Sequence, residues 1–180
     1  LTDVTGVQTC ALPIYIPEFA GQTVLATFNE NDTTYTTVPA RRPVTIRHLL
    51  THTSGIDYAG IGSPVMRAIY ARAGIAGGFG TNTDVIGEEV KDLGKLPLAH
   101  QPGEKWTYGL NVDVLGYLVE IWSDKPLDIF LRERLFEPLG MNDTWFYLPP
   151  DKHSRLVKVS GEDAERSEEH TSELQSRQSI

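Results

Sequence analysis

The sequence predicts a mainly α-helical chain, and two observations support this prediction. Apolar residues recur at helical intervals in several stretches, most clearly at Leu110, Val114, Leu115, Leu118, Val119 and Trp122, which would share one face of a helix. Residues that favour helix starts, such as Thr45 and the pair Ser63-Pro64, precede other stretches of this kind. The stretch Thr23–Ala40, with its threonine-rich run, predicts a loop or an irregular hairpin.

The first two helices are predicted from their caps. Thr45 is expected to cap a short helix that turns Leu49 and Leu50 inward, with Gly55 ending the following turn. Ser63-Pro64 is expected to start the next helix, because proline is favoured in the first helical position. Its predicted inner face comprises Val65, Met66, Ile69 and Tyr70.

The remaining elements follow the same logic. Thr83 or Asp84 can cap a helix that runs through Leu93 to a stop at Gly94. The long helix that follows is expected to end in a cap and turn at Ser123-Asp124-Lys125. A last helix is predicted from Pro126, and Trp145–Leu148 is predicted to start a strand. The expected buried face of that helix is Leu127, Phe130, Leu131 and Leu135.

Tyr108 is the leading candidate for a reactive side chain. It follows a turn at Pro102-Gly103 and directly precedes the long helix, so it has rigid support on both sides. In an extended run, Trp106 would lie on the same side as Tyr108. A phenol placed in this way can act as a general base or proton relay if neighbouring cations lower its pKa. The alternative is a half-buried tyrosine that packs against the start of the helix.

Other candidate sites are weaker. His48 and His52 have a spacing that two metal ligands on one helical face could use, with Asp57 as a possible third ligand, but the Glu of the His-Glu-x-x-His motif is absent. The alternative for His52 and Ser54 is that they satisfy backbone groups after the helix. Ser54 lacks both the Gly-x-Ser-x-Gly and the Ser-x-x-Lys context of a nucleophile. We therefore expect neither a metal nor a cofactor.

Both ends of the chain are predicted to lie outside the domain. Residues 4–14 match the translation of one short oligonucleotide, a common sequencing adapter, and residues 167–176 match the translation of its opposite strand. The two ends of a natural protein have no reason to be encoded by the two strands of one oligonucleotide. We therefore expect residues 1–14 and 166–180 to be artefactual adapter translation, and we place a partial domain at residues 15–165.

The composition limits the partners. The net charge is −8, and leaving out both flanks removes four acidic and two basic residues, which changes it to −6. An acidic stretch without a basic run argues against nucleic acid as a partner. The one cysteine, Cys10, lies in a flank, so neither a disulfide nor a thiol nucleophile is expected. No apolar run in this chain is long enough for a transmembrane segment.

Four blocks of sequence together resemble one known family. They are Thr-Ile-Arg-His-Leu-Leu-Thr-His-Thr-Ser-Gly, Gln-Pro-Gly-Glu-Lys-Trp-x-Tyr, Asp-Val-Leu-Gly and Leu-Phe-Glu-Pro-Leu-Gly-Met-Asn-Asp-Thr, in order between Val44 and Phe146. The chain thereby resembles the serine β-lactamase-related hydrolases, which include penicillin-binding D-alanyl-D-alanine peptidases, class C β-lactamases and β-lactamase-like esterases. The resemblance implies an α+β fold, with an antiparallel sheet and a helical region, of which this chain would be a mainly helical internal fragment lacking much of the sheet.

The resemblance also implies the chemistry. The family transfers an acyl group through a serine ester, using a Ser-x-x-Lys nucleophile, a Tyr or Ser element and a Lys- or His-x-Gly strand. Tyr108 matches the second element, while no serine in this chain has lysine three positions later. The family pattern Tyr-x-Asn would place Asn at position 110, where Leu110 stands, with Asn111 one place later. Leu110 and Asn111 are therefore only weak substrate-binding candidates, and ester or amide hydrolysis is favoured over β-lactam resistance.

Two functions are compatible with these observations. The first is a fragment of a serine hydrolase that acts on a small-molecule or peptide acyl substrate, with the nucleophile upstream of this chain. The second is a catalytically inactive relative that binds peptides or a protein partner. The fragment as written is expected to be inactive, and family resemblance alone suggests a place outside the cytoplasm.

Overall fold

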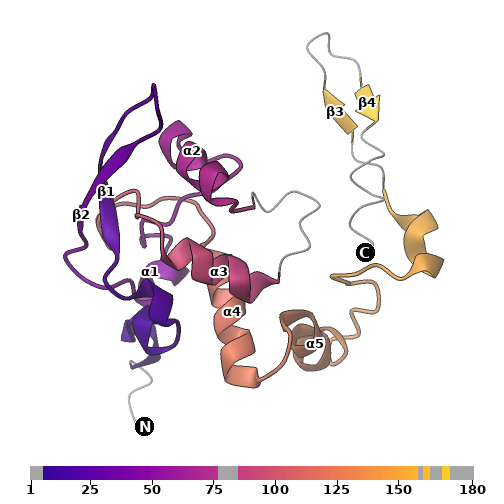
Figure 1. Cartoon of the computed structure of the whole chain (residues 1–180). Coiled ribbons are helices and arrows are strands. Elements are labelled where there is room, and N and C mark those ends of the chain that lie inside the picture. Colours follow the sequence, from indigo (N-terminus) through magenta and orange to yellow (C-terminus); the bar gives the residue numbers. More distant parts are fainter. Residues whose placement is uncertain (1–5, 77–84, 158–159, 163–167, 171–180) are drawn as a thin grey trace. The chain divides into compact units, whose positions relative to one another are not determined.

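The computed structural model describes residues 6–76, 85–157, 160–162 and 168–170, with backbone only for the last two ranges. These residues fall into two compact units that divide between Leu127 and Asp128 (Figure 1). In the first unit, three short 3-10 helices, η1 (Val7–Thr9), η2 (Leu12–Ile14) and η3 (Pro17–Phe19), precede the strands β1 (Thr23–Phe28) and β2 (Tyr35–Pro39). The helices α1 (Ile46–Leu50), α2 (Pro64–Ala73), α3 (Ile86–Gly94) and α4 (Asn111–Ser123) follow.

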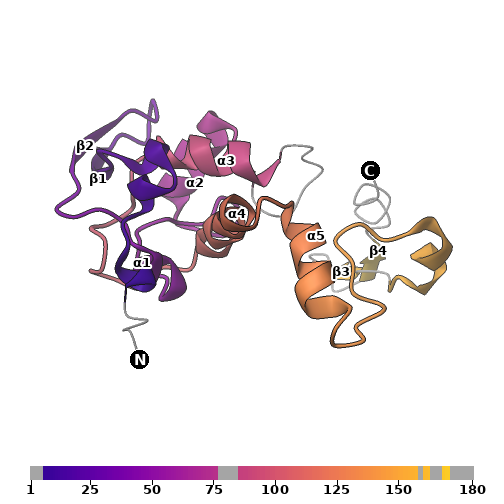
Figure 2. The ribbon, with the colours of Figure 1, turned by 90° about the horizontal axis from the view of Figure 1, so that it is seen from below.

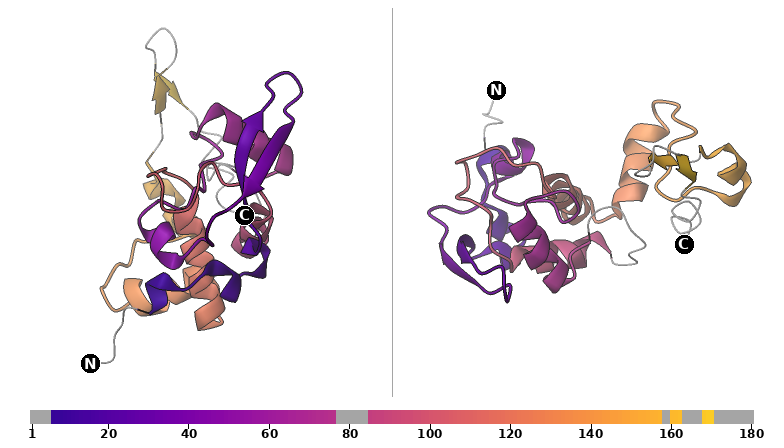
Figure 3. Two further views of the ribbon diagram at one scale, coloured as in Figure 1. Left: turned by 90° about the vertical axis from the view of Figure 1, so that its left-hand side faces the viewer. Right: turned by 90° about the horizontal axis from the view of Figure 1, so that it is seen from above.

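The strands β1 and β2 form the irregular hairpin that the sequence suggested. They pair antiparallel from Thr23 opposite Pro39 to Phe28 opposite Tyr35, with a register shift between Leu25 and Thr27. The end of the hairpin near Tyr35 lies beside α2 (Figures 1 and 3). On its inner side, Val24 is buried and bridges in parallel to Leu98, so this edge of the hairpin is tied to the segment before the candidate site.

The caps define the helices as predicted. Thr45 accepts a hydrogen bond from the backbone N–H of His48, and the His48 Nδ1 accepts one from the N–H of Thr45. Ser63 caps α2, which begins at Pro64, and α4 ends at Ser123 with Asp124 in the left-handed conformation. The predicted caps Thr83 and Asp84 lie outside the described residues, and the described cap of α3 is Val85.

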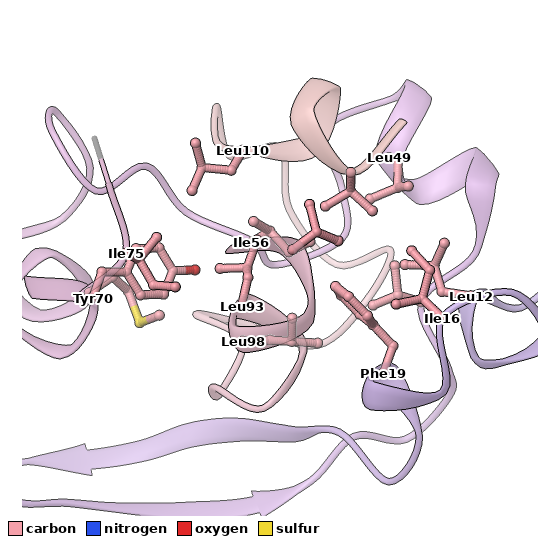
Figure 4. Packing of buried hydrophobic residues seen from close by; sticks show 14 of the residues in the cluster. Leu12, Ile16, Phe19, Leu49, Ile56, Tyr70, Ile75, Leu93, Leu98 and Leu110 are labelled. Carbon is pink, nitrogen blue, oxygen red and sulfur yellow. The ribbon is translucent and has the colours of Figure 1, made fainter. Parts of the chain in front are cut away.

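The apolar core of the first unit joins these elements. Figure 4 shows residues from η2, η3, α1, α2 and α3 converging on it. From α4, the predicted inward residues Val114 and Leu118 are completely buried, whereas Trp122 is half exposed. On α1, Leu49 is buried as predicted, but the prediction for Leu50 was wrong because this helix has only five residues and buries one narrow face. Leu12, in the predicted artefactual flank, is also fully buried; the flank assignment stays a prediction.

The second unit begins at Asp128, within the helix α5 (Leu127–Leu131), which leads into the π-helix η4 (Arg132–Phe136). The 3-10 helix η5 (Pro150–Arg155) and the strands β3 (Ser160–Glu162) and β4 (Glu168–His170) follow (Figure 2). Of the face predicted to be buried, Leu127, Phe130 and Leu131 are partly buried, whereas the prediction for Leu135 was wrong, since it is 42% exposed. Trp145–Leu148 forms no strand in the described structure. Asp143 instead organises this region by pairing with Lys152 and Arg155.

Among the described residues, no helix has the length and apolar character needed to cross a membrane.

Candidate active site

Backbone hydrogen bonds fix the segment that carries Tyr108. The N–H of Gly103 donates to the carbonyl of Thr53 at 2.7 Å, and the N–H of Thr107 donates to the carbonyl of His52 at 2.8 Å. On the other side of Tyr108, the N–H of Leu110 donates to the carbonyl of Asp57 at 3.3 Å. The chain around Tyr108 is therefore attached at three points to the loop that follows α1, as the rigid support predicted from the sequence requires.

Gly109 allows this close approach. A Cβ added at Gly109 would collide with the carbonyl oxygen of Ile56 and with the backbone of Asp57. Only glycine lets the two chain segments lie this close together. The glycine thereby brings Tyr108 against Tyr58, one residue beyond Asp57.

The Tyr108 ring stacks on two other rings. It stacks on His52, with ring centroids 5.3 Å apart and an interplanar angle of 22°, and on Tyr58 at 5.6 Å and 23°. Trp106 is also in ring contact with Tyr108, at 6.5 Å and 30°, which confirms that these two side chains lie on the same side. Tyr108 is 50% exposed and Trp106 67% exposed, so solvent or a substrate can reach both.

Burial and charge act on Tyr58. Its pKa is raised above the ordinary tyrosine value, first by burial and then by the negative charges of Asp113 and ionised Tyr108. Tyr58 is therefore a neutral phenol at physiological pH. Of the two stacked tyrosines, Tyr108 is the one with a half-exposed ring, which places it rather than Tyr58 where a substrate can make contact.

A buried polar chain lies behind the stacked rings. The Ser54 hydroxyl donates to the Asn111 Oδ1 at 2.5 Å, and the Asn111 Nδ2 donates to the His52 Nδ1 at 3.0 Å. The Ser54 oxygen in turn accepts the N–H of Ile56 at 3.0 Å. Ser54 and Asn111 are both fully buried, so their side chains are committed to this chain of hydrogen bonds.

The two weak substrate-binding candidates lie below the surface. Leu110 is 3% exposed and belongs to the apolar core, and Asn111 is completely buried. Their role in substrate binding stays a prediction. The structure gives each another role: Leu110 packs the start of α4, and Asn111 links that helix to the loop at His52.

The other residues considered from the sequence are engaged elsewhere. His48 serves the cap of α1, and burial together with Arg42 and Arg47 lowers its pKa. Asp57 accepts hydrogen bonds from the N–H of Tyr58 and from both the N–H and the hydroxyl of Ser63. No cluster of three potential metal ligands occurs among the described residues.

His100 is a further buried polar side chain near this segment. Its Nδ1 lies 3.0 Å from the carbonyl oxygen of Gln101, and its Nε2 lies 2.9 Å from the Thr107 hydroxyl. A carbonyl oxygen can only accept, so Nδ1 donates to it, and Nε2 is hydrogen-bonded to the Thr107 hydroxyl. His100 thereby holds the residue directly before Tyr108.

Sequence reasoning missed the partners of Tyr108. His52 was considered as a metal ligand or a turn residue, and Tyr58 and His100 were not considered. The available signal was the density of aromatic and imidazole side chains on both sides of Ser54-Gly55, but only the fold brings them to Tyr108.

The family of the chain follows from comparison with known proteins. A family model described as Beta-lactamase matches residues 15–177, and the chain belongs to this family. The predicted family resemblance and the predicted fold, a largely helical part of the β-lactamase/transpeptidase-like architecture, are thereby confirmed.

Relatives at the sequence level include esterases. The chain is 41% identical over 106 residues to Esterase EstB of Burkholderia gladioli, covering 57% of this chain and 26% of that protein. It is 33% identical over 151 residues to Lovastatin esterase of Penicillium rubens, covering 82% of this chain and 35% of that protein. The chain thus spans about a third or less of the length of these relatives.

A solved structure gives the same picture. Simvastatin synthase (LovD) from Aspergillus terreus superimposes with a TM-score of 0.73 at 27% identity, over 94% of this chain and 41% of that one. The likeness extends over nearly the whole chain.

Proposed function

We propose that this chain is the tyrosine-bearing part of a serine hydrolase that cleaves an ester or amide bond through an acyl-enzyme, and that Tyr108 is its proton relay. The observation that carries the proposal is the position of Tyr108: a half-exposed phenol whose neighbours on both sides are hydrogen-bonded to the loop at 52–57. A relay needs a proton-bearing group that is accessible and held in one place.

The nucleophile of the proposed reaction would come from another part of a longer protein. No serine of this chain has lysine three residues later, and Ser54, which lies beside the site, is buried with its hydroxyl engaged. In the proposed reaction, a serine oxygen attacks the carbonyl carbon and the bond to the leaving group breaks. The proton of the serine hydroxyl passes through Tyr108 to the leaving oxygen or nitrogen, and water later releases the acid.

The relatives support an ester as the substrate. Two of them are named as esterases, and a leucine at position 110 supplies no amide to bind a β-lactam or peptide carbonyl. The substrate class proposed for the full-length protein is therefore a small-molecule ester.

The test is Tyr108→Phe in the full-length protein, assayed with two esters of the same acid. With an alkyl ester we expect turnover to fall by about 100-fold or more, because an alkoxide is a poor leaving group without a proton. With a p-nitrophenyl ester we expect a smaller loss, because p-nitrophenolate leaves readily as an anion. Unchanged turnover of both esters would refute the role of Tyr108.

A further inference from the structure

We propose that His52 is a positioning residue for Tyr108, with its imidazole ring fixed in turn by the buried pair Asn111 and Ser54. This inference deepens the proposed function and rests on it, because the orientation of Tyr108 matters to turnover only if Tyr108 carries a proton. His52 is assigned no contact with the substrate.

Ring stacking is the direct link between the two residues. The His52 and Tyr108 rings are nearly parallel, at 22°, with centroids 5.3 Å apart. The Tyr58 ring also stacks on Tyr108, at 5.6 Å and 23°, so two neighbouring rings limit the rotation of the phenol ring. The stacked rings therefore restrict the direction in which the phenol oxygen points.

His52 has a defined anchor in the protein interior. Its Nδ1 accepts a hydrogen bond from the Asn111 Nδ2, so the neutral imidazole carries its proton on Nε2. The amide of Asn111 is itself held in one orientation, because its Oδ1 accepts from the Ser54 hydroxyl. The Asn111 amide, held by the Ser54 hydroxyl, hydrogen-bonds the imidazole at Nδ1, so buried residues restrain the imidazole plane.

The backbone of His52 supports the same conclusion. His52 has a φ of 51°, in the left-handed region that a residue with a side chain seldom adopts. In this conformation its carbonyl accepts the N–H of Thr107, the residue before Tyr108. One residue in a strained conformation thus contacts Tyr108 through its ring and holds the preceding residue through its backbone. Strain of this kind persists only where surrounding contacts maintain it.

A displacement of the phenol would reduce turnover more than binding. Small errors in the position of a proton-transferring group lower the rate of the chemical step, whereas the ground-state contacts of the substrate are kept. Removal of the His52 ring should therefore lower kcat about tenfold and leave KM within about twofold.

The experiment is a double-mutant cycle in the full-length protein, with hydrolysis of an alkyl ester as the assay. His52→Asn removes the ring and tolerates the left-handed backbone, since Asn is enriched there. It is measured alone and combined with Tyr108→Phe, and the thermal unfolding midpoint of each variant reports folding. His48→Gln is the matched control, because His48 lies four residues earlier and makes its described hydrogen bond to Thr45. If His52→Asn does not fold, His52→Gly replaces it with the same backbone tolerance.

The outcomes separate the two proposals. If His52 acts by positioning Tyr108, His52→Asn lowers kcat about tenfold in the otherwise native enzyme. In the Tyr108→Phe background the same substitution lowers kcat no further. The control His48→Gln leaves kcat unchanged. Equal losses in both backgrounds, or none in either, would overturn the role of His52 while leaving that of Tyr108 intact. Full activity of Tyr108→Phe by itself would overturn both.

Discussion

Asn111 offers the sharpest test of the polar chain behind Tyr108. Replacement by leucine keeps a branched side chain of similar shape and removes both amide hydrogen bonds, to the Ser54 hydroxyl at 2.5 Å and to the His52 Nδ1 at 3.0 Å. Ser54 is fully buried, so its hydroxyl would lose its acceptor without gaining water, at a cost of about 1–3 kcal/mol. His52 is only partly buried, and water can replace the lost donor at a smaller cost.

We therefore expect Asn111→Leu to lower the free energy of unfolding by about 2–3 kcal/mol. The measurement is urea unfolding of the 180-residue chain, followed by far-ultraviolet circular dichroism. Val112→Ala is the matched control, because Val112 is the next residue of α4 and is 62% exposed, so its truncation should change the same quantity by less than about 0.5 kcal/mol. A change of less than about 0.5 kcal/mol for Asn111→Leu would show that the polar chain contributes nothing to the fold.

Two further predictions concern the core. Leu49→Ala should lower the free energy of unfolding by about 2–5 kcal/mol, because Leu49 is completely buried. Leu50→Ala on the same helix should lower it by less than about 1 kcal/mol, because Leu50 is 60% exposed. Equal decreases for the two variants in urea unfolding would contradict this packing. Burial raises the pKa of Tyr70, whose hydroxyl accepts the N–H of Asp57, so the folded state holds this proton at a pH where the unfolded chain has released it. The contribution of Tyr70 to the free energy of unfolding is therefore complete below about pH 10 and decreases above it by up to about 1.4 kcal/mol per pH unit. Tyr70→Phe should make the decrease in the free energy of unfolding with pH shallower. An unchanged dependence of that free energy on pH would refute the role of Tyr70.

Local signals in the sequence were sufficient where a few neighbouring residues decide the structure. The Thr45 and Ser63 caps and the turn after Ser123 depend on hydrogen bonds and dihedral preferences within four residues, and all three occur as predicted. The long apolar repeat of α4 likewise specified Val114 and Leu118 as core residues.

Predictions that depended on a distant partner were less successful. Apolar spacing shows which residues share a face, but it does not show what covers that face. For this reason Leu50, Trp122 and Leu135 are exposed although the pattern predicted them to be buried. Trp145–Leu148 has the β-branched and aromatic bias of a strand only in part, and no neighbouring strand pairs with it in the described structure.

The sequence predicted one residue of the candidate site, Tyr108, and the fold brings its partners to it. The motif around Tyr108 identified the phenol and its support. The partners His52 and Tyr58 lie some fifty residues earlier in the chain, and hydrogen bonds from Thr107 and Leu110 bring them together with Tyr108. The sequence separates these groups, so no local pattern could have shown the stacked rings or the link from Ser54 through Asn111.

The central claim is that Tyr108 relays a proton during acyl transfer, and the rate of acyl-enzyme formation tests it most directly. The full-length protein is mixed with excess alkyl ester, quenched at intervals and analysed by mass spectrometry for the acylated serine. We predict that Tyr108→Phe forms the same acyl-enzyme about 100-fold more slowly or worse, with its thermal unfolding midpoint unchanged. Acylation at the native rate in that variant would contradict the account.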